Sequence, residues 1–137
     1  MLRSKLAAFA GALLLAGSAF AAQQEACPDI NEIQAEGLSM AEEIGPNIFI
    51  SYNISVYNTP SIWGFVLAPV EGESDEVALE AANEILSTMS APGVPEQHGN
   101  AMICTYDTGR QDVFAAAIKD DGQISPLKLK QYFKSAH

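Results

Sequence analysis

Positive charge is the scarcest feature of this 137-residue chain. The chain has 7 Lys and Arg residues against 17 Asp and Glu, and no Lys or Arg lies between residues 22 and 109. A protein that binds nucleic acid without sequence preference needs a basic face to neutralise phosphates, and a protein that adheres to anionic lipid needs a similar face. The composition therefore argues against both classes.

Histidine and cysteine are also scarce, with 2 residues of each. Cys27, Cys104, His98 and His137 also lack the Cys-x2–4-Cys and His-x3–5-His spacing of a four-ligand structural zinc site. Enzyme motifs are missing as well, because the chain has no glycine-rich phosphate loop, no His-Glu-x-x-His and no Gly-x-Ser-x-Gly. Acidic pairs such as Glu42-Glu43 are typical of a solvated surface. We therefore expect no catalytic residue and no bound metal, and a hydrolase with an unrecognised site is the last alternative.

Hydrophobic runs long enough to interact with a membrane are confined to the N-terminus. Arg3 and Lys5 precede an apolar stretch, and Ala19-Phe20-Ala21 has the small-x-small pattern that signal peptidase accepts. Residues 1–21 are thus predicted to be a signal peptide and residues 22–137 a single mature domain. The alternative is an uncleaved N-terminal anchor. We expect an exported protein, periplasmic or secreted, with no membrane attachment after cleavage.

Cleavage would leave 5 basic residues, all in the last quarter of the chain: Arg110, Lys119, Lys128, Lys130 and Lys134. One explanation of this asymmetry is solubility, since like charges keep an exported protein monomeric. The other is a dipolar surface, acidic over the body and basic at the C-terminal end. An acidic body would suit an interaction or inhibitor module that acts on a cationic partner.

The two cysteines, Cys27 and Cys104, are expected to pair in an oxidising compartment, because neither lies in a Cys-x-x-Cys motif. Such a bridge would stabilise the fold by about 4.5 kcal/mol through loop closure in the unfolded chain. Two free thiols are the alternative.

The hydrophobic pattern predicts a single α+β domain. We expect an antiparallel sheet of four or five strands, one long helix packed on it, and a short N-terminal helix held by the disulfide. The predicted segments are a helix over about 28–36, a hairpin of strands 47–56 and 62–68, a helix over 75–89, and strands 101–106 and 113–118. Strand 47–56 alternates with period two, which predicts one buried face. The tail from Ser125 fits a helix or a strand.

Several short motifs occur in an order that resembles a known family. They are Ala26-Cys27-Pro28, Trp63-Gly64-Phe65-Val66-Leu67, an alanine-rich helix and Cys104-Thr105-Tyr106. This family comprises small exported proteins from Legionella and related intracellular bacteria; some are named hemin-binding proteins and most have no known function. The resemblance covers nearly the whole mature chain. It implies the Cys27–Cys104 bridge and a non-enzymatic role that includes hemin binding.

Hemin would need an axial iron ligand and cations for its two propionates. His98, expected in a loop, is the first candidate ligand, and the alternatives are Met102 and the four tyrosines Tyr52, Tyr57, Tyr106 and Tyr132. The cations would be Arg110, Lys128, Lys130 and Lys134. Trp63 and Phe65 would line the groove, although each also fits a hydrophobic core. An exposed apolar groove would favour hemin, and a flat acidic face would favour the interaction module.

Overall fold

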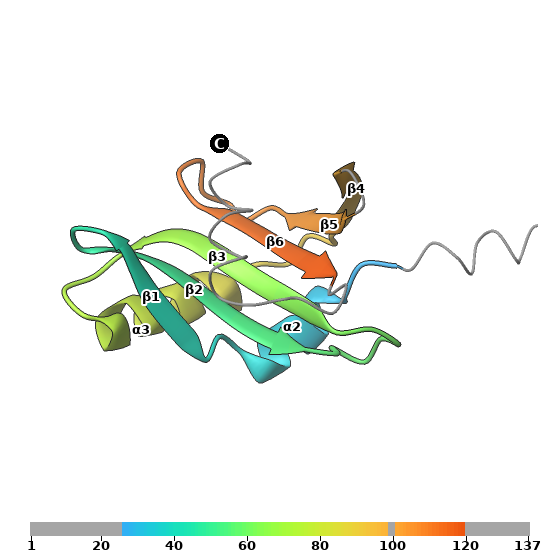
Figure 1. Cartoon of the computed structure of the whole chain (residues 1–137), viewed down its shortest axis with the longest axis horizontal. Helices are drawn as coiled ribbons and strands as arrows, with labels where there is room; N and C mark the ends of the chain where they lie inside the picture. Colours follow the sequence, from blue (N-terminus) through green and yellow to red (C-terminus); the bar gives the residue numbers. More distant parts are fainter. Residues whose placement is uncertain (1–25, 99–100, 120–137) are drawn as a thin grey trace, which may run out of the picture.

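In a computed structural model, which describes residues 26–98 and 101–119, the described residues form a six-stranded antiparallel sheet with two helices on one face (Figure 1). The elements, in chain order, are α2 (Ile30–Glu36), β1 (Met40–Gly45), β2 (Ile48–Ser55), β3 (Trp63–Glu71), α3 (Asp75–Ser87), β4 (Val94–His98), β5 (Ala101–Tyr106) and β6 (Phe114–Lys119). The strand order is β1-β2-β3-β6-β5-β4. Two three-stranded meanders therefore meet at the β3–β6 ladder, and α3 connects them along the chain.

The expectation of a four- or five-stranded sheet is wrong, because the described residues form a six-stranded sheet; the long helix and the short N-terminal helix correspond to α3 and α2. The strands that the pattern failed to predict are β1 and β4, and they form the two edges of the sheet. Edge strands pair on one side only and carry charged residues and proline more readily than central strands. β4 contains Pro95 and Glu96. His98 is consequently the last residue of a strand and does not lie in the expected loop.

The other predicted segments form α2, β2, β3, α3, β5 and β6, with boundaries shifted by up to three residues. α3 begins after Ser74, whose side chain accepts a hydrogen bond from the amide of Val77, and its buried residues include Ala78 and Ala82. These small side chains let the helix lie close to the sheet. α2 ends at Gly37, whose φ of 76° lies in the left-handed region that favours glycine.

The core has a layer on each face of the sheet. The larger layer lies between the helices and the sheet and contains Phe49, Trp63 and Phe65. The smaller layer lies on the opposite face and contains Ile50 and Tyr52. Because Phe49 and Ile50 are both buried in β2, the prediction of a single buried face for this strand is wrong. Within the described residues, no helix is long and apolar enough to cross a membrane.

Candidate functional site

A pocket of about 270 Å³ opens where the chain enters α2 beside the turn between β2 and β3. Two segments far apart in the sequence line it, namely Ala26, Cys27, Asp29 and Glu32 on one side and Tyr57, Asn58, Thr59 and Pro60 on the other. Its position therefore depends on what holds the N-terminal segment against the sheet.

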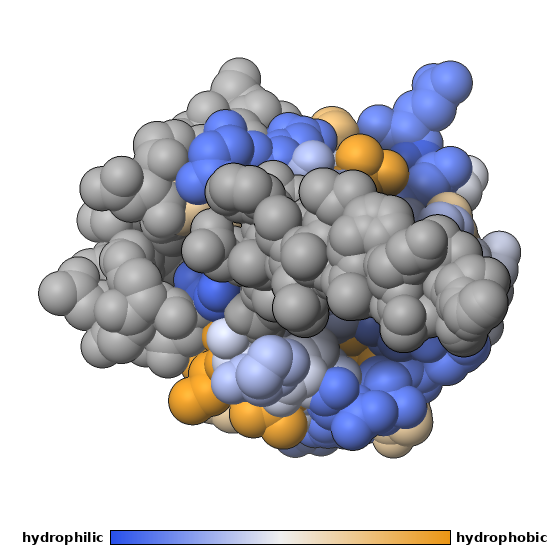
Figure 2. Space-filling view, turned by 90° about the vertical axis from the view of Figure 1, so that its right-hand side faces the viewer, coloured by the Kyte–Doolittle hydropathy of each residue, from blue (hydrophilic) through white to orange (hydrophobic). Residues whose placement is uncertain are grey.

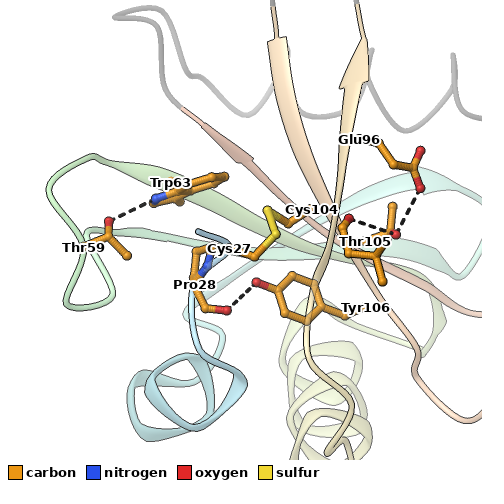
Figure 3. The surroundings of a disulfide bond; sticks show 9 residues. Cys27, Pro28, Thr59, Trp63, Glu96, Cys104, Thr105 and Tyr106 are labelled. Atoms are coloured by element: carbon orange, nitrogen blue, oxygen red, sulfur yellow. Dashed lines mark hydrogen bonds between the residues drawn. A yellow bond between two sulfur atoms is a disulfide. The ribbon is translucent and has the colours of Figure 1, made fainter. Parts of the chain in front are cut away.

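The disulfide between Cys27 and Cys104 ties this N-terminal segment to β5, as the sequence predicted. Beside it, the Tyr106 hydroxyl donates a buried hydrogen bond of 2.6 Å to the carbonyl oxygen of Pro28. In the view of Figure 3, the Cys27–Cys104 disulfide lies between the side chains of Trp63 and Tyr106. The ring of Tyr106 also meets Phe65 edge-on, with 5.6 Å between ring centroids. A covalent bond, a hydrogen bond and an aromatic contact thus fix this wall of the pocket.

The opposite wall is the β2–β3 turn, which has an unusual backbone. Tyr57 and Asn58 have φ values of 46° and 58°, and positive φ is rare for a residue as bulky as tyrosine. The Tyr57 side chain is buried, and its hydroxyl donates to the carbonyl oxygen of Asn53 at 3.2 Å. Thr59 accepts a 3.0 Å hydrogen bond from the indole N–H of Trp63. These hydrogen bonds and the burial of Tyr57 support the positive-φ turn that forms this wall of the pocket.

The charge at the pocket comes from two carboxylates. Asp29 caps α2 by accepting a 2.8 Å hydrogen bond from the amide of Asn31, and both Asp29 and Glu32 are exposed to solvent. Burial raises the pKa of Tyr57 to about 12, against its usual value near 10. Burial also raises the pKa of Tyr106, and the neighbouring Tyr57 and Asp29 add to this effect. Both phenols therefore stay neutral at physiological pH, and the pocket is negative.

The exposed side chains of the two helices are strongly acidic. We call this the acidic helix surface, and it comprises the exposed residues Asp29, Glu32, Glu36, Glu76, Glu80 and Glu84. The helices are joined by Gln34, whose side-chain amide donates to the carbonyl oxygens of Leu86 and Met89 at 2.8 and 2.7 Å. In Figure 2, hydrophilic residues cover much of the described surface that is visible, and hydrophobic residues form small patches.

The aromatic residues predicted to line a ligand groove lie in the core. Trp63 and Phe65 are both 0% exposed in the layer between helices and sheet. Of the tyrosines considered as iron ligands, Tyr52 donates a 2.8 Å hydrogen bond to Glu42, and burial raises its pKa, with the hydrogen bond to Glu42 and its charge adding to the rise. The phenols of Tyr57 and Tyr106 are hydrogen-bonded as described above. A phenolate ligand would first have to lose these bonds and its proton.

The remaining predicted site residues are spread along the chain. His98 ends the edge strand β4, and Arg110 is exposed between β5 and β6. Lys128, Lys130 and Lys134 lie outside the described residues, as does the predicted signal peptide. Their binding roles stay predictions. The part of the chain that the structure describes holds no group of three or more His, Cys, Asp or Glu residues arranged to bind a metal ion.

Little in the sequence indicates the pocket. Asp29 and Glu32 were identifiable only as charges that suit a helix N-terminus, and Tyr57 to Pro60 only as a turn. Their approach depends on the Cys27–Cys104 bridge and on the positive φ of Tyr57, neither of which is a local sequence pattern.

One family comparison bears on the chain. The family described as "Domain of unknown function (DUF4949)" matches residues 26–132. No curated protein and no solved structure matches.

Proposed function

The chain belongs to the DUF4949 family, whose function is unknown, and we propose that in this member the pocket and the acidic helix surface bind a cationic protein partner. The pocket receives one Lys or Arg side chain of the partner, and the surrounding carboxylates attract its neighbouring cations. Export from the cell and a non-enzymatic role are parts of the same proposal. The Cys27–Cys104 bridge is compatible with export, because disulfides persist in oxidising compartments.

The observation that carries this proposal is the pocket with Asp29 and Glu32 on its lining. About 270 Å³ is slightly less than the roughly 300–1,000 Å³ of sites for drug-sized ligands, so the pocket suits a side chain or a small amine. Guanidinium and ammonium groups pair with carboxylates through charge-assisted hydrogen bonds. The phenol of Tyr57 stays neutral at physiological pH, so the negative charge of the pocket comes from the two carboxylates.

The arrangement of the helix carboxylates also supports a cationic partner. Glu76, Glu80 and Glu84 follow one another at four-residue spacing, and so do Glu32 and Glu36 on α2. Like charges at this spacing destabilise a helix by about 0.2–0.5 kcal/mol per pair. The chain between residues 26 and 109 has no Lys or Arg to offset this repulsion. A partner of opposite charge would relieve it on binding.

Solubility alone would also explain a negative surface, and a binding experiment separates the two explanations. A short fluorescein-labelled oligo-arginine peptide is titrated with the mature protein, and fluorescence anisotropy gives the Kd. We expect saturable binding that is lost in about 1 M NaCl, where the Debye length falls to about 3 Å. An oligo-glutamine peptide of the same length serves as the uncharged control.

A pair of matched variants tests the pocket itself. Asp29→Asn/Glu32→Gln should raise the Kd roughly two- to thirty-fold, since two exposed ion pairs worth about 0.2–1 kcal/mol each are lost. Asparagine at position 29 still caps the helix. Glu71→Gln/Glu73→Gln removes the same charge near the far end of β3, roughly 25 Å from the pocket at about 3.3 Å per residue. If the two double variants raise the Kd equally, the peptide binds by general electrostatic attraction and not in the pocket, which would contradict the proposal.

Hemin binding, which the resemblance to Legionella-type proteins implies, is the second hypothesis. The observation that favours it is that Arg110 is exposed and that Phe114, four residues later in the chain, is 48% exposed. The burial of Trp63 and Phe65 argues for a site elsewhere than the expected groove. A hemin titration followed in the Soret region distinguishes this hypothesis from oligo-arginine binding, because the two ligands carry opposite charges.

A further inference from the structure

The sheet face opposite the helices, which we call the second face, carries its own buried apolar cluster. The cluster consists of Ile50, Tyr52, Val66, Ala68, Ile103 and Ile118, each no more than 8% exposed. Strand register brings them together, because Tyr52 pairs with Val66 and Ile103 pairs with Ile118. The helices α2 and α3 pack against the other face (Figure 1). Neither helix therefore covers this cluster.

Exposed apolar side chains surround the cluster. Met40 pairs with Tyr52 and Phe114 pairs with Ala68, so both share its face, and each is about half exposed. By register, Ile54 and Val94 share this face too, and they are similarly exposed. A buried apolar centre with a partly exposed apolar rim is the expected appearance of a surface that something covers incompletely.

We propose that residues 120–137 of the same chain cover the second face. They follow β6, which lies between β3 and β5 in the middle of the sheet and carries Ile118 of the cluster next to its end. They contain apolar side chains that need burial, namely Ile124, Leu127, Leu129 and Phe133. The DUF4949 match continues to residue 132, so most of this segment belongs to the domain that the family shares.

Charge favours the same placement. The segment contains Lys128, Lys130 and Lys134 against Asp120 and Asp121, so its net charge is +1, whereas the whole chain has a net charge of -10. The second face bears the carboxylates Glu42 and Glu96, which register places opposite Ile50 and Ile103. A cationic, apolar segment is attracted to such a face both by its charge and by the apolar area that it can bury. This inference does not depend on the proposed cationic partner.

Zero-length carbodiimide crosslinking of the full chain, read by peptide mass spectrometry, tests the placement directly. This reagent joins a lysine to a carboxylate only when the two are in contact. We expect crosslinks from the three C-terminal lysines to Glu42 or Glu96. The acidic helix surface is the internal control, since its carboxylates lie over the opposite face. Crosslinks to Glu76, Glu80 or Glu84 instead, or none within the chain, would overturn the proposal.

A variant of the segment supplies a second readout. Leu127→Asp/Leu129→Asp/Phe133→Asp should uncover the second face, raise the fluorescence of an added apolar dye and abolish the crosslinks to Glu42. Ser125→Asp/Gln131→Asp/Ser135→Asp makes the same charge change at polar positions of the same segment and should leave the dye fluorescence low. Equal dye fluorescence of the two variants would contradict the proposal. Crosslinks between isotopically distinct chains would do so as well, because they would show that a second copy covers the face.

Discussion

Removal of the Cys27–Cys104 bridge should lower the free energy of unfolding by about 4.5 kcal/mol. The two cysteines are 77 residues apart in the sequence, and closing a loop of that length in the unfolded chain accounts for this value at 25 °C. A domain of this size has a total stability of about 5–15 kcal/mol, so the loss is a large part of the whole. The perturbation is Cys27→Ala/Cys104→Ala, which leaves no buried thiol or hydroxyl behind.

Trp63 provides the assay. It is the one tryptophan of the chain and is 0% exposed, so its fluorescence should shift when the protein unfolds in urea. With a slope of about 1–3 kcal/mol/M, the loss moves the urea midpoint down by roughly 1.5–4.5 M. A decrease of less than about 1 kcal/mol would refute the loop-closure reasoning and would mean that the unfolded chain without the bridge is already compact.

Tyr106 makes the reasoning more specific, because its hydrogen bond to Pro28 holds the same N-terminal segment without the bridge. Tyr106→Phe should cost about 1–3 kcal/mol by leaving a buried carbonyl oxygen without its donor. If the bridge acts on the unfolded chain, this cost should be the same with and without it, within about 0.5 kcal/mol. A larger coupling would show that the bridge acts by positioning Pro28 in the folded state.

Further predictions concern packing, pH, ligand and processing. Gly93→Ala should destabilise the fold by about 1–3 kcal/mol in urea unfolding, because its Cβ would lie 2.7 Å from the Tyr106 ring, whereas Gly45→Ala, with no atom closer than 4.0 Å, should change the stability by less than about 0.5 kcal/mol. Stability should fall as the pH rises from about 10 to about 12, because the unfolded chain then loses the Tyr57 proton that the folded state keeps; Tyr57→Phe should flatten this part of the pH profile, and an unchanged profile would contradict the assignment. His98→Ala should shift the Soret band if hemin binds through this residue, and the absence of any saturable Soret change in the unaltered protein would remove the hemin hypothesis. Exported protein should have the intact mass of a chain beginning at Ala22, and a mass that retains residues 1–21 would contradict the predicted cleavage.

The sequence predicted those parts of the fold in which local pattern and final burial agree. The apolar stripe of α3 faces the sheet, and Ala78 and Ala82 lie at its centre as the 3.6-residue period requires. The disulfide was predicted from two cysteines and the expected export signal, without any geometry. In each case the information lies within one segment or in the chemistry of the compartment.

The edge strands and β2 show why the hydrophobic pattern did not predict the rest of the sheet. β1 and β4 pair on one side only, so polar sequences form them and no alternation marks them. In β2, Ser51 is fully buried. Its hydroxyl can be buried because it donates a hydrogen bond to the carbonyl oxygen of Met40 at 3.0 Å. A buried polar residue with a long-range partner reads in the sequence as a surface position. The burial of both faces of β2 was therefore not predictable from its two-residue alternation of apolar and polar residues.

The position of the C-terminal lysines links the proposed cover of the second face to the proposed binding of a cationic partner. If Lys128, Lys130 and Lys134 contact the second face, they are on the opposite side of the sheet from the acidic helix surface, which then has none of these cations as a partner within the chain. That is the condition under which the repulsion among Glu76, Glu80 and Glu84 would persist in the free protein and be relieved by an external cation.

If the lysines instead crosslink to α3, they neutralise its carboxylates within the chain, and oligo-arginine would have to displace them. The crosslinking result therefore predicts how binding responds to loss of the segment. With the lysines on the second face, replacing all three by Gln should leave the oligo-arginine Kd nearly unchanged, whereas with the lysines on α3 the same replacement should tighten binding.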